Sequence, residues 1–113
     1  MDYPSYDNAA EQAVLGALLL GDKLTLGAVA SIVSSRDFHH ECHQQIFEAT
    51  MRLADRGETV DLLTLQEELI RQGTFEQIGG FDFLVGLFDN VPTTLQVAYH
   101  AKTVRLCALW RGC

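Results

Sequence analysis

The residues best suited to chemistry lie in one short window, residues 39–43, which read HHECH. Imidazole and thiolate are ligands that zinc prefers, and His39 and His43 would lie one turn apart if the window began a helix. A structural zinc site needs further ligands, and the remaining candidates, His100 and Cys107, stand isolated near the end of the chain. The favoured interpretation is a polar helix N-terminus with one or two surface histidines, and a metal site is the alternative.

Other catalytic signatures are missing from the sequence. No segment resembles the phosphate-binding loop G-x-x-x-x-G-K-[ST], and Gly79-Gly80 is followed by Phe81 rather than by a lysine. There is no G-x-S-x-G segment. The carboxylates stand where helix capping or a solvated helix face explains them, and we interpret Glu67-Glu68 as an exposed pair. We therefore expect no catalytic residues, no cofactor and no bound metal in this chain.

The charge of the chain argues against nucleic-acid binding. Fifteen acidic and eight basic side chains give a net charge of −7, which repels a phosphate backbone. The nearest approach to a basic cluster is Lys102, Arg105 and Arg111 in the last helix. A helix-turn-helix would need a basic or amide-rich recognition face earlier in the chain. With catalysis and nucleic-acid binding disfavoured, the remaining function class is a domain that binds protein.

Length and cysteine content indicate a single folded domain covering residues 1–113, with its cysteines reduced. A globule of 113 residues buries roughly two thirds of the surface of its unfolded chain, which suffices for a single core. The three cysteines, Cys42, Cys107 and Cys113, lack paired spacing and predict free thiols. No basic segment follows Met1 as in a signal peptide, so we expect a cytoplasmic protein.

The helix expected at the centre of the fold spans residues 8–20, NAAEQAVLGALLL. Residues 13–20 are all apolar or glycine, so this helix should be buried on every side, although the run is far too short to cross a membrane. Asp7 or Asn8 can cap its start, Glu11 would complete a capping box with Asn8, and Gly21 would end it.

Five amphipathic helices should surround this central helix. The first follows Asp22 and runs to Val33, and the next begins near Phe38 after Asp37 and ends at Gly57. No segment alternates with the period of a strand, so the predicted fold is an all-α bundle of about six helices. The fourth helix of the chain is capped by Asp61 and closed by Gly73, with Ile70 on its buried side. A short fifth helix covers residues 81–88. The last helix runs from Leu95 towards Trp110 after a cap at Thr93 or Thr94.

The inward faces of these helices define a predicted core, and two aromatic residues define a predicted contact surface. Phe81 and Phe83 straddle the start of the fifth helix, and an exposed aromatic residue there would anchor an interface, although both could equally line the core. The predicted core residues are Val14, Leu15, Leu18, Leu19, Ile46, Phe47, Leu65, Leu69, Leu84 and Leu87.

Five segments in order resemble the N-terminal domain of DnaB-type replicative DNA helicases. They are AEQAVLGALLL (10–20), DFHHECHQQIFEA (37–49), GETVDLLTLQEEL (57–69), IGGFDFLVGL (78–87) and NVPTTLQVAYHAKTV (90–104). The order and spacing of all five segments, rather than any single one, make the resemblance specific. It covers nearly the whole chain.

The resemblance implies a helical interaction domain without ATPase activity. Such a domain pairs with its neighbours on the N-terminal side of a hexameric helicase ring and helps to dock the primase and, in some systems, a loader. The ATPase module of the family, which binds ATP and Mg²⁺ and contacts DNA, would lie downstream. The chain would then be an isolated domain or a naturally short relative, and the basic helix ending in LCALWRGC favours a truncated chain.

The sequence departs from the family pattern at surface positions. His39 stands where the family usually has Tyr, Tyr99 is shifted relative to the usual E-A-Y, and His43 matches a position often held by His. Phe81 is where the self-association implied by the resemblance would first be sought. The alternative function is a metal- or small-molecule-binding helical domain centred on residues 39–43.

Overall fold

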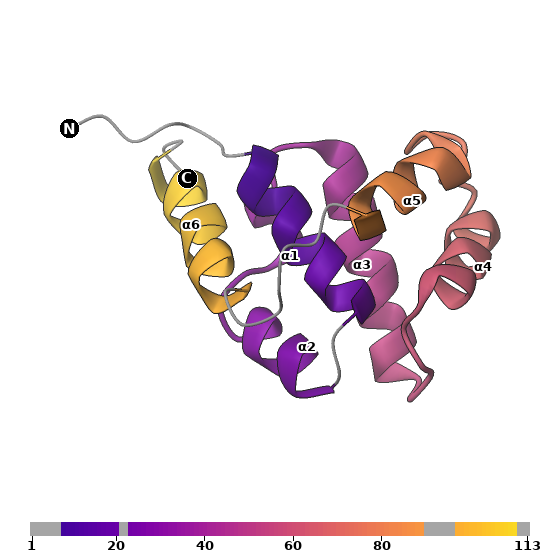
Figure 1. Cartoon of the computed structure of the whole chain (residues 1–113), viewed down its shortest axis with the longest axis horizontal. Helices are drawn as coiled ribbons and strands as arrows, with labels where there is room; N and C mark the ends of the chain where they lie inside the picture. Colours follow the sequence, from indigo (N-terminus) through magenta and orange to yellow (C-terminus); the bar gives the residue numbers. More distant parts are fainter. Residues whose placement is uncertain (1–7, 21–22, 90–96, 111–113) are drawn as a thin grey trace.

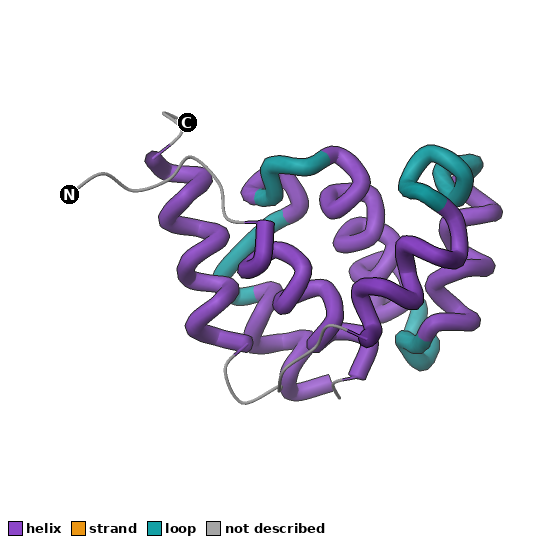
Figure 2. Tube along the Cα trace, turned by 45° about the horizontal axis from the view of Figure 1, so that its top comes forward, coloured by secondary structure: helices purple, strands orange, loops and turns teal. Residues whose placement is uncertain are grey.

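The computed structural model describes residues 8–20, 23–89 and 97–110, and within these ranges it contains helices and no strands (Figures 1 and 2). Several residues with a predicted role lie outside the described residues: Asp7, Gly21, Asp22, Thr93, Thr94, Leu95, Arg111 and Cys113. The elements in chain order are α1 (Asn8–Leu20), α2 (Lys23–Ala30), the short 3₁₀ helix η1 (Ser35–Asp37), α3 (Glu41–Asp55), α4 (Leu62–Gln72), α5 (Gly80–Asp89) and α6 (Val97–Trp110).

Helix α1 is the centre of the bundle, as its uninterrupted apolar run predicts. It contacts α2, α3, α5 and α6, and Figure 1 shows it between α6 on one side and α3 and α5 on the other. Val14, Leu15 and Leu18 are each at most 2% exposed. Burial of such side chains stabilises a fold by about 1.5–3 kcal/mol each, so α1 holds the surrounding helices together.

Helix α4 packs against α3 and α5 at the edge of the molecule, and its two ends are set by local sequence. The Asp61 side chain accepts a hydrogen bond from the Thr64 amide at 2.9 Å, and the Thr64 hydroxyl accepts one from the Asp61 amide at 3.0 Å. At the other end Gly73 adopts a left-handed conformation with φ of 76°, which costs glycine little. The predicted cap and terminator of this helix are both present.

Three predicted details of the helices are wrong. Helix α2 ends at Ala30 rather than at Val33, because the chain turns at residues 31–32. Helix α3 begins at Glu41, and Asp37 does not cap it: its carboxylate instead accepts hydrogen bonds from the Ser34 amide at 2.8 Å and from Arg105 of α6 at 3.0 Å. Ile70 is 54% exposed, because the buried arc of α4 runs through Leu65 and Leu69 on its other side.

All ten predicted core residues are buried in the structure. The least buried of them, Leu19, is 6% exposed, and all ten belong to one apolar core. Cys107 is buried and Cys42 is partly buried, and burial raises the pKa of Cys42. No helix in the described ranges is long and apolar enough to cross a membrane.

Candidate functional site

A buried carboxylate and imidazole join α1 to α3. Glu11 and His43 are each 1% exposed, and Oε1 of Glu11 lies 2.6 Å from Nδ1 of His43. The other oxygen, Oε2, accepts a hydrogen bond from the His39 amide at 2.7 Å. Both oxygens of Glu11 therefore bind groups about thirty positions further along the chain, which the predicted capping role at the start of α1 did not anticipate.

The surroundings of this pair favour the ionised carboxylate. Burial by itself would raise the pKa of Glu11, but the hydrogen bonds from His43 and the His39 amide outweigh it and lower that pKa below its usual value. The Phe83 ring lies 5.9 Å from the His43 ring, and the His40 ring lies 5.1 Å from it. Burial, together with repulsion by the neighbouring imidazoles, lowers the pKa of His40.

The histidine window does not converge as a metal site would require. His43 is buried rather than on the surface, and its Nδ1 is bound to Glu11. His39 is exposed, and its ring contacts His40. Among the residues that the structure describes, no three His, Cys, Asp or Glu side chains are grouped so that they could hold a metal ion.

A second buried carboxylate, Glu68, fastens α4 to the end of α3. It is fully buried, and the prediction that it lies on a solvated face is wrong; its neighbour Glu67 is exposed. Oε1 accepts from Arg56 at 2.7 Å and from Arg71 at 3.0 Å, while Oε2 accepts from Arg52 at 2.9 Å and from Gln72 at 3.1 Å. The Arg56 hydrogen bond, the largest cause, outweighs burial and lowers the pKa of Glu68 to about 2.

The two aromatic residues of the predicted contact surface have different surroundings. Phe81, in the first turn of α5, is 47% exposed. Phe83 is partly buried and packs against the core and His43. Of the two, Phe81 is therefore available to a partner and Phe83 mainly supports the fold.

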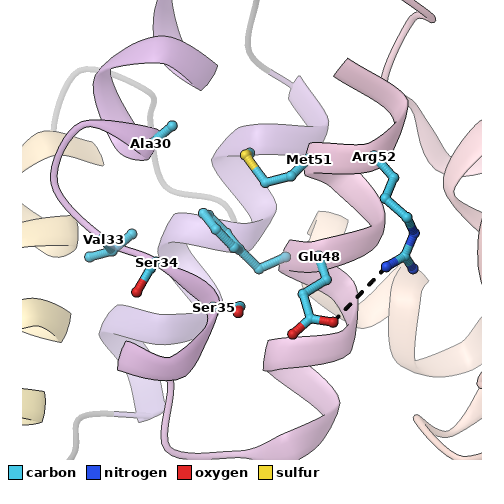
Figure 3. Close-up of a pocket in the computed structure, with 8 residues that line it drawn as sticks. Ala30, Val33, Ser34, Ser35, Glu48, Met51 and Arg52 are labelled. Carbon is cyan, nitrogen blue, oxygen red and sulfur yellow. Dashed lines mark ion pairs between the residues drawn. The ribbon is translucent and has the colours of Figure 1, made fainter. Parts of the chain in front are cut away.

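A groove, the α3 groove, opens between α3 and the segment that follows α2 (Figure 3). Its volume is about 420 Å³, and most of its lining surface is apolar. Figure 3 shows Met51 of α3 directed toward Ala30 and Val33, while Arg52 lies on the far side of α3 and forms a 4.0 Å ion pair with Glu48. The apolar lining is Ala30, Val33, Phe47 and Met51, and the polar lining is Ser34, Ser35, Glu48 and Arg52.

The sequence contained a signal for both buried carboxylates, although neither was predicted to be buried. Glu11 stands three and four residues before Val14 and Leu15, and Glu68 stands three residues after Leu65 and one before Leu69. These offsets place each carboxylate on the apolar side of its helix. The α3 groove carries no such signal, because it depends on how far α2 and η1 stand from α3.

Comparison with known families gives one match over most of the chain. Residues 3–106 match the family described as the DnaB-like helicase N-terminal domain. The described fold is also similar to the crystal structure of the N-terminal domain of DnaB helicase from Mycobacterium tuberculosis. That similarity has a TM-score of 0.91 and 39% identity, and it covers 96% of this chain and 78% of the other.

The similar relatives are much longer proteins. This chain is 46% identical over 101 residues to the replicative DNA helicase DnaB of Geobacillus stearothermophilus and 39% identical over 101 residues to the replicative DNA helicase DnaC of Bacillus subtilis (strain 168). It is 40% identical over 108 residues to the replicative DNA helicase DnaB of Mycobacterium leprae (strain TN). The matches cover 89%, 89% and 96% of this chain, but only 22%, 22% and 18% of those relatives.

Proposed function

This chain belongs to the family of DnaB-like helicase N-terminal domains, and we propose that it is the non-catalytic interaction domain of a replicative DNA helicase. In this role it associates with copies of itself within a hexameric ring and docks a primase or a helicase loader during DNA replication in the cytoplasm. The observation that carries the proposal is the 46% identity over the domain to a replicative helicase, joined to a fold similarity with a TM-score of 0.91.

The proposal assigns the chemistry of the parent protein to its other parts. ATP and Mg²⁺ belong to the ATPase domain of the parent helicase, and this domain binds neither them nor DNA. The net charge of −7 supports this division, because it disfavours contact with a phosphate backbone. An ATPase assay and a single-stranded DNA titration of the isolated chain test it, and either activity would contradict it.

The domain would act through geometry. Copies arranged in a ring present several equivalent docking surfaces, so weak individual contacts with primase or loader molecules reinforce one another. Phe81 supports this role, because a half-exposed aromatic side chain on a rigid helix is a typical interface anchor.

Sedimentation equilibrium over a broad concentration range, with reductant present, tests the self-association. A reversible monomer–dimer equilibrium is expected, and Phe81→Ala should weaken it while leaving the melting temperature nearly unchanged. Leu84→Ala is the matched control on the same helix, because Leu84 is fully buried and its loss should destabilise the fold. A collapse of stability in Phe81→Ala would instead assign Phe81 to the core.

Titration of a labelled copy of the chain with the cognate primase or with the loader tests the docking. Saturable binding that tightens when the copies are assembled is expected from multivalency. Absence of binding by both the assembled and the monomeric chain would contradict the docking role.

A further inference from the structure

Helix α6 has its large side chains on the outside and its small ones inside. Ala101, Val104 and Ala108 are at most 1% exposed and lie on the side that packs against α1 and α2. The opposite side carries the α6 stripe, defined as Tyr99, Lys102, Leu106 and Leu109.

The α6 stripe is a continuous apolar surface with one cation. Tyr99 is 68% exposed, and Leu106 and Leu109 are each 49% exposed. Lys102, Leu106 and Leu109 follow Tyr99 by three, seven and ten residues, and these offsets place all four side chains along one line of the helix. An exposed line of large apolar residues of this kind marks an interaction surface.

Lys102 is the cation that this surface offers to a partner. It is exposed and makes no ion pair within the part of the chain that the structure describes. Its neighbour Arg105 is already committed, because its guanidinium lies 3.0 Å from the Asp37 carboxylate. The α6 stripe therefore needs an apolar counterpart with a carboxylate beside it.

The α3 groove has that chemistry. Its floor is apolar, with Val33 and Phe47 buried and Met51 partly exposed. Glu48 stands beside it with nearly half of its side chain exposed, and its one ion pair among the described residues is the 4.0 Å contact with Arg52 (Figure 3). Arg52 is held more closely by Glu68, at 2.9 Å, so the Glu48 carboxylate is free to bind another cation.

We propose that the α6 stripe of one copy of this chain docks in the α3 groove of a second copy, with Leu106 in the groove and Lys102 paired with Glu48. The inference rests on the proposed self-association and names two surfaces that take part in it besides Phe81. The contact joins two different patches of the chain, so it either repeats around a ring or is made twice across a two-fold axis. An α6-to-α6 pair is disfavoured, because it would provide no carboxylate for Lys102.

Exchange of the two charges tests the contact. Glu48→Lys and Lys102→Glu should each raise the dissociation constant of self-association about tenfold or more, measured by sedimentation equilibrium at low salt. The double variant, with the charges exchanged, should recover the dissociation constant of the wild type to within about threefold. Glu67→Lys is the matched control, because Glu67 is exposed on α4, and it should leave the association unchanged.

A second variant keeps the test independent of charge and of folding. Leu106→Gln should weaken association without lowering the melting temperature, since half of the side chain is already exposed. Circular dichroism melting of each variant excludes unfolding as the cause, which matters for Glu48→Lys because the new lysine lies near Arg52.

The outcomes separate this inference from the proposed function. If the wild type associates and Phe81→Ala weakens it, but neither charge variant does, the groove contact is wrong and self-association stands. Additive losses in the double variant, without recovery, also overturn the contact. A wild-type chain that stays monomeric at every concentration overturns both, and the α6 stripe is then covered by another protein or by a further part of the parent protein.

Discussion

Replacement of the buried Glu68 by Gln should destabilise this domain more than the loss of an exposed charge such as Glu67. The substitution keeps the shape of the side chain but removes the negative charge that accepts hydrogen bonds from Arg52, Arg56 and Arg71. The hydrogen bonds from Arg52 and Arg56 connect the end of α3 to α4, whereas Arg71 lies on α4 itself. The neighbouring Glu67→Gln is the matched control, because Glu67 is exposed on the same helix.

The magnitude follows from the protonation of Glu68. Its pKa is lowered from 4.5 to about 2, and each pKa unit corresponds to about 1.4 kcal/mol, so the upper limit is about 3.5 kcal/mol. The arginine side chains are 34%, 39% and 59% exposed, and solvent screening reduces this value. We expect Glu68→Gln to lower the free energy of unfolding at pH 7 by about 1–3 kcal/mol, or the melting temperature by roughly 4–12 °C.

The dependence on pH provides the sharper assay. The pKa of Glu68 is lower in the folded state than in the unfolded state, so its contribution is complete above about pH 4.5 and is lost as the pH falls towards 2. Urea unfolding at several pH values should therefore show the difference between wild type and Glu68→Gln shrinking over this range. A difference no larger than that of Glu67→Gln, or one that stays constant down to pH 2, would refute the reasoning.

Three further substitutions test other contacts, each by urea unfolding at pH 7. Glu11→Ala leaves the buried His43 without its partner and should cost about 1–3 kcal/mol; a loss no larger than that of Gln12→Ala, on the same turn, would contradict the role of Glu11. Leu18→Ala opens a cavity in α1 and should cost about 2–5 kcal/mol, so an unchanged unfolding curve would overturn the central position of that helix. Asp61→Ala removes the cap of α4 and should cost about 0.5–2 kcal/mol, and no loss would mean that the capping bond contributes nothing.

The sequence by itself determined the helical class of the fold and much of its local detail. Apolar periodicity and the uninterrupted run in α1 depend only on neighbouring residues. They predicted the central helix and ten core residues, all of which are buried in the structure. The cap at Asp61 and the left-handed Gly73 are likewise local, since each acts within a few residues of its own position. The ordered segments also predicted the family, which the comparisons confirm.

Local periodicity places Glu11 and Glu68 on the apolar sides of their helices, but only the tertiary structure decided which partners these buried groups have. Glu67 and Glu68 are the same residue type at adjacent positions, about 100° apart around the helix. Glu67 is exposed to solvent, whereas Glu68 is buried and accepts hydrogen bonds from three arginines. Glu11 meets His43, and Asp37 meets Arg105, across 32 and 68 positions. Such pairings depend on how the helices pack against one another, a long-range property that local periodicity does not encode.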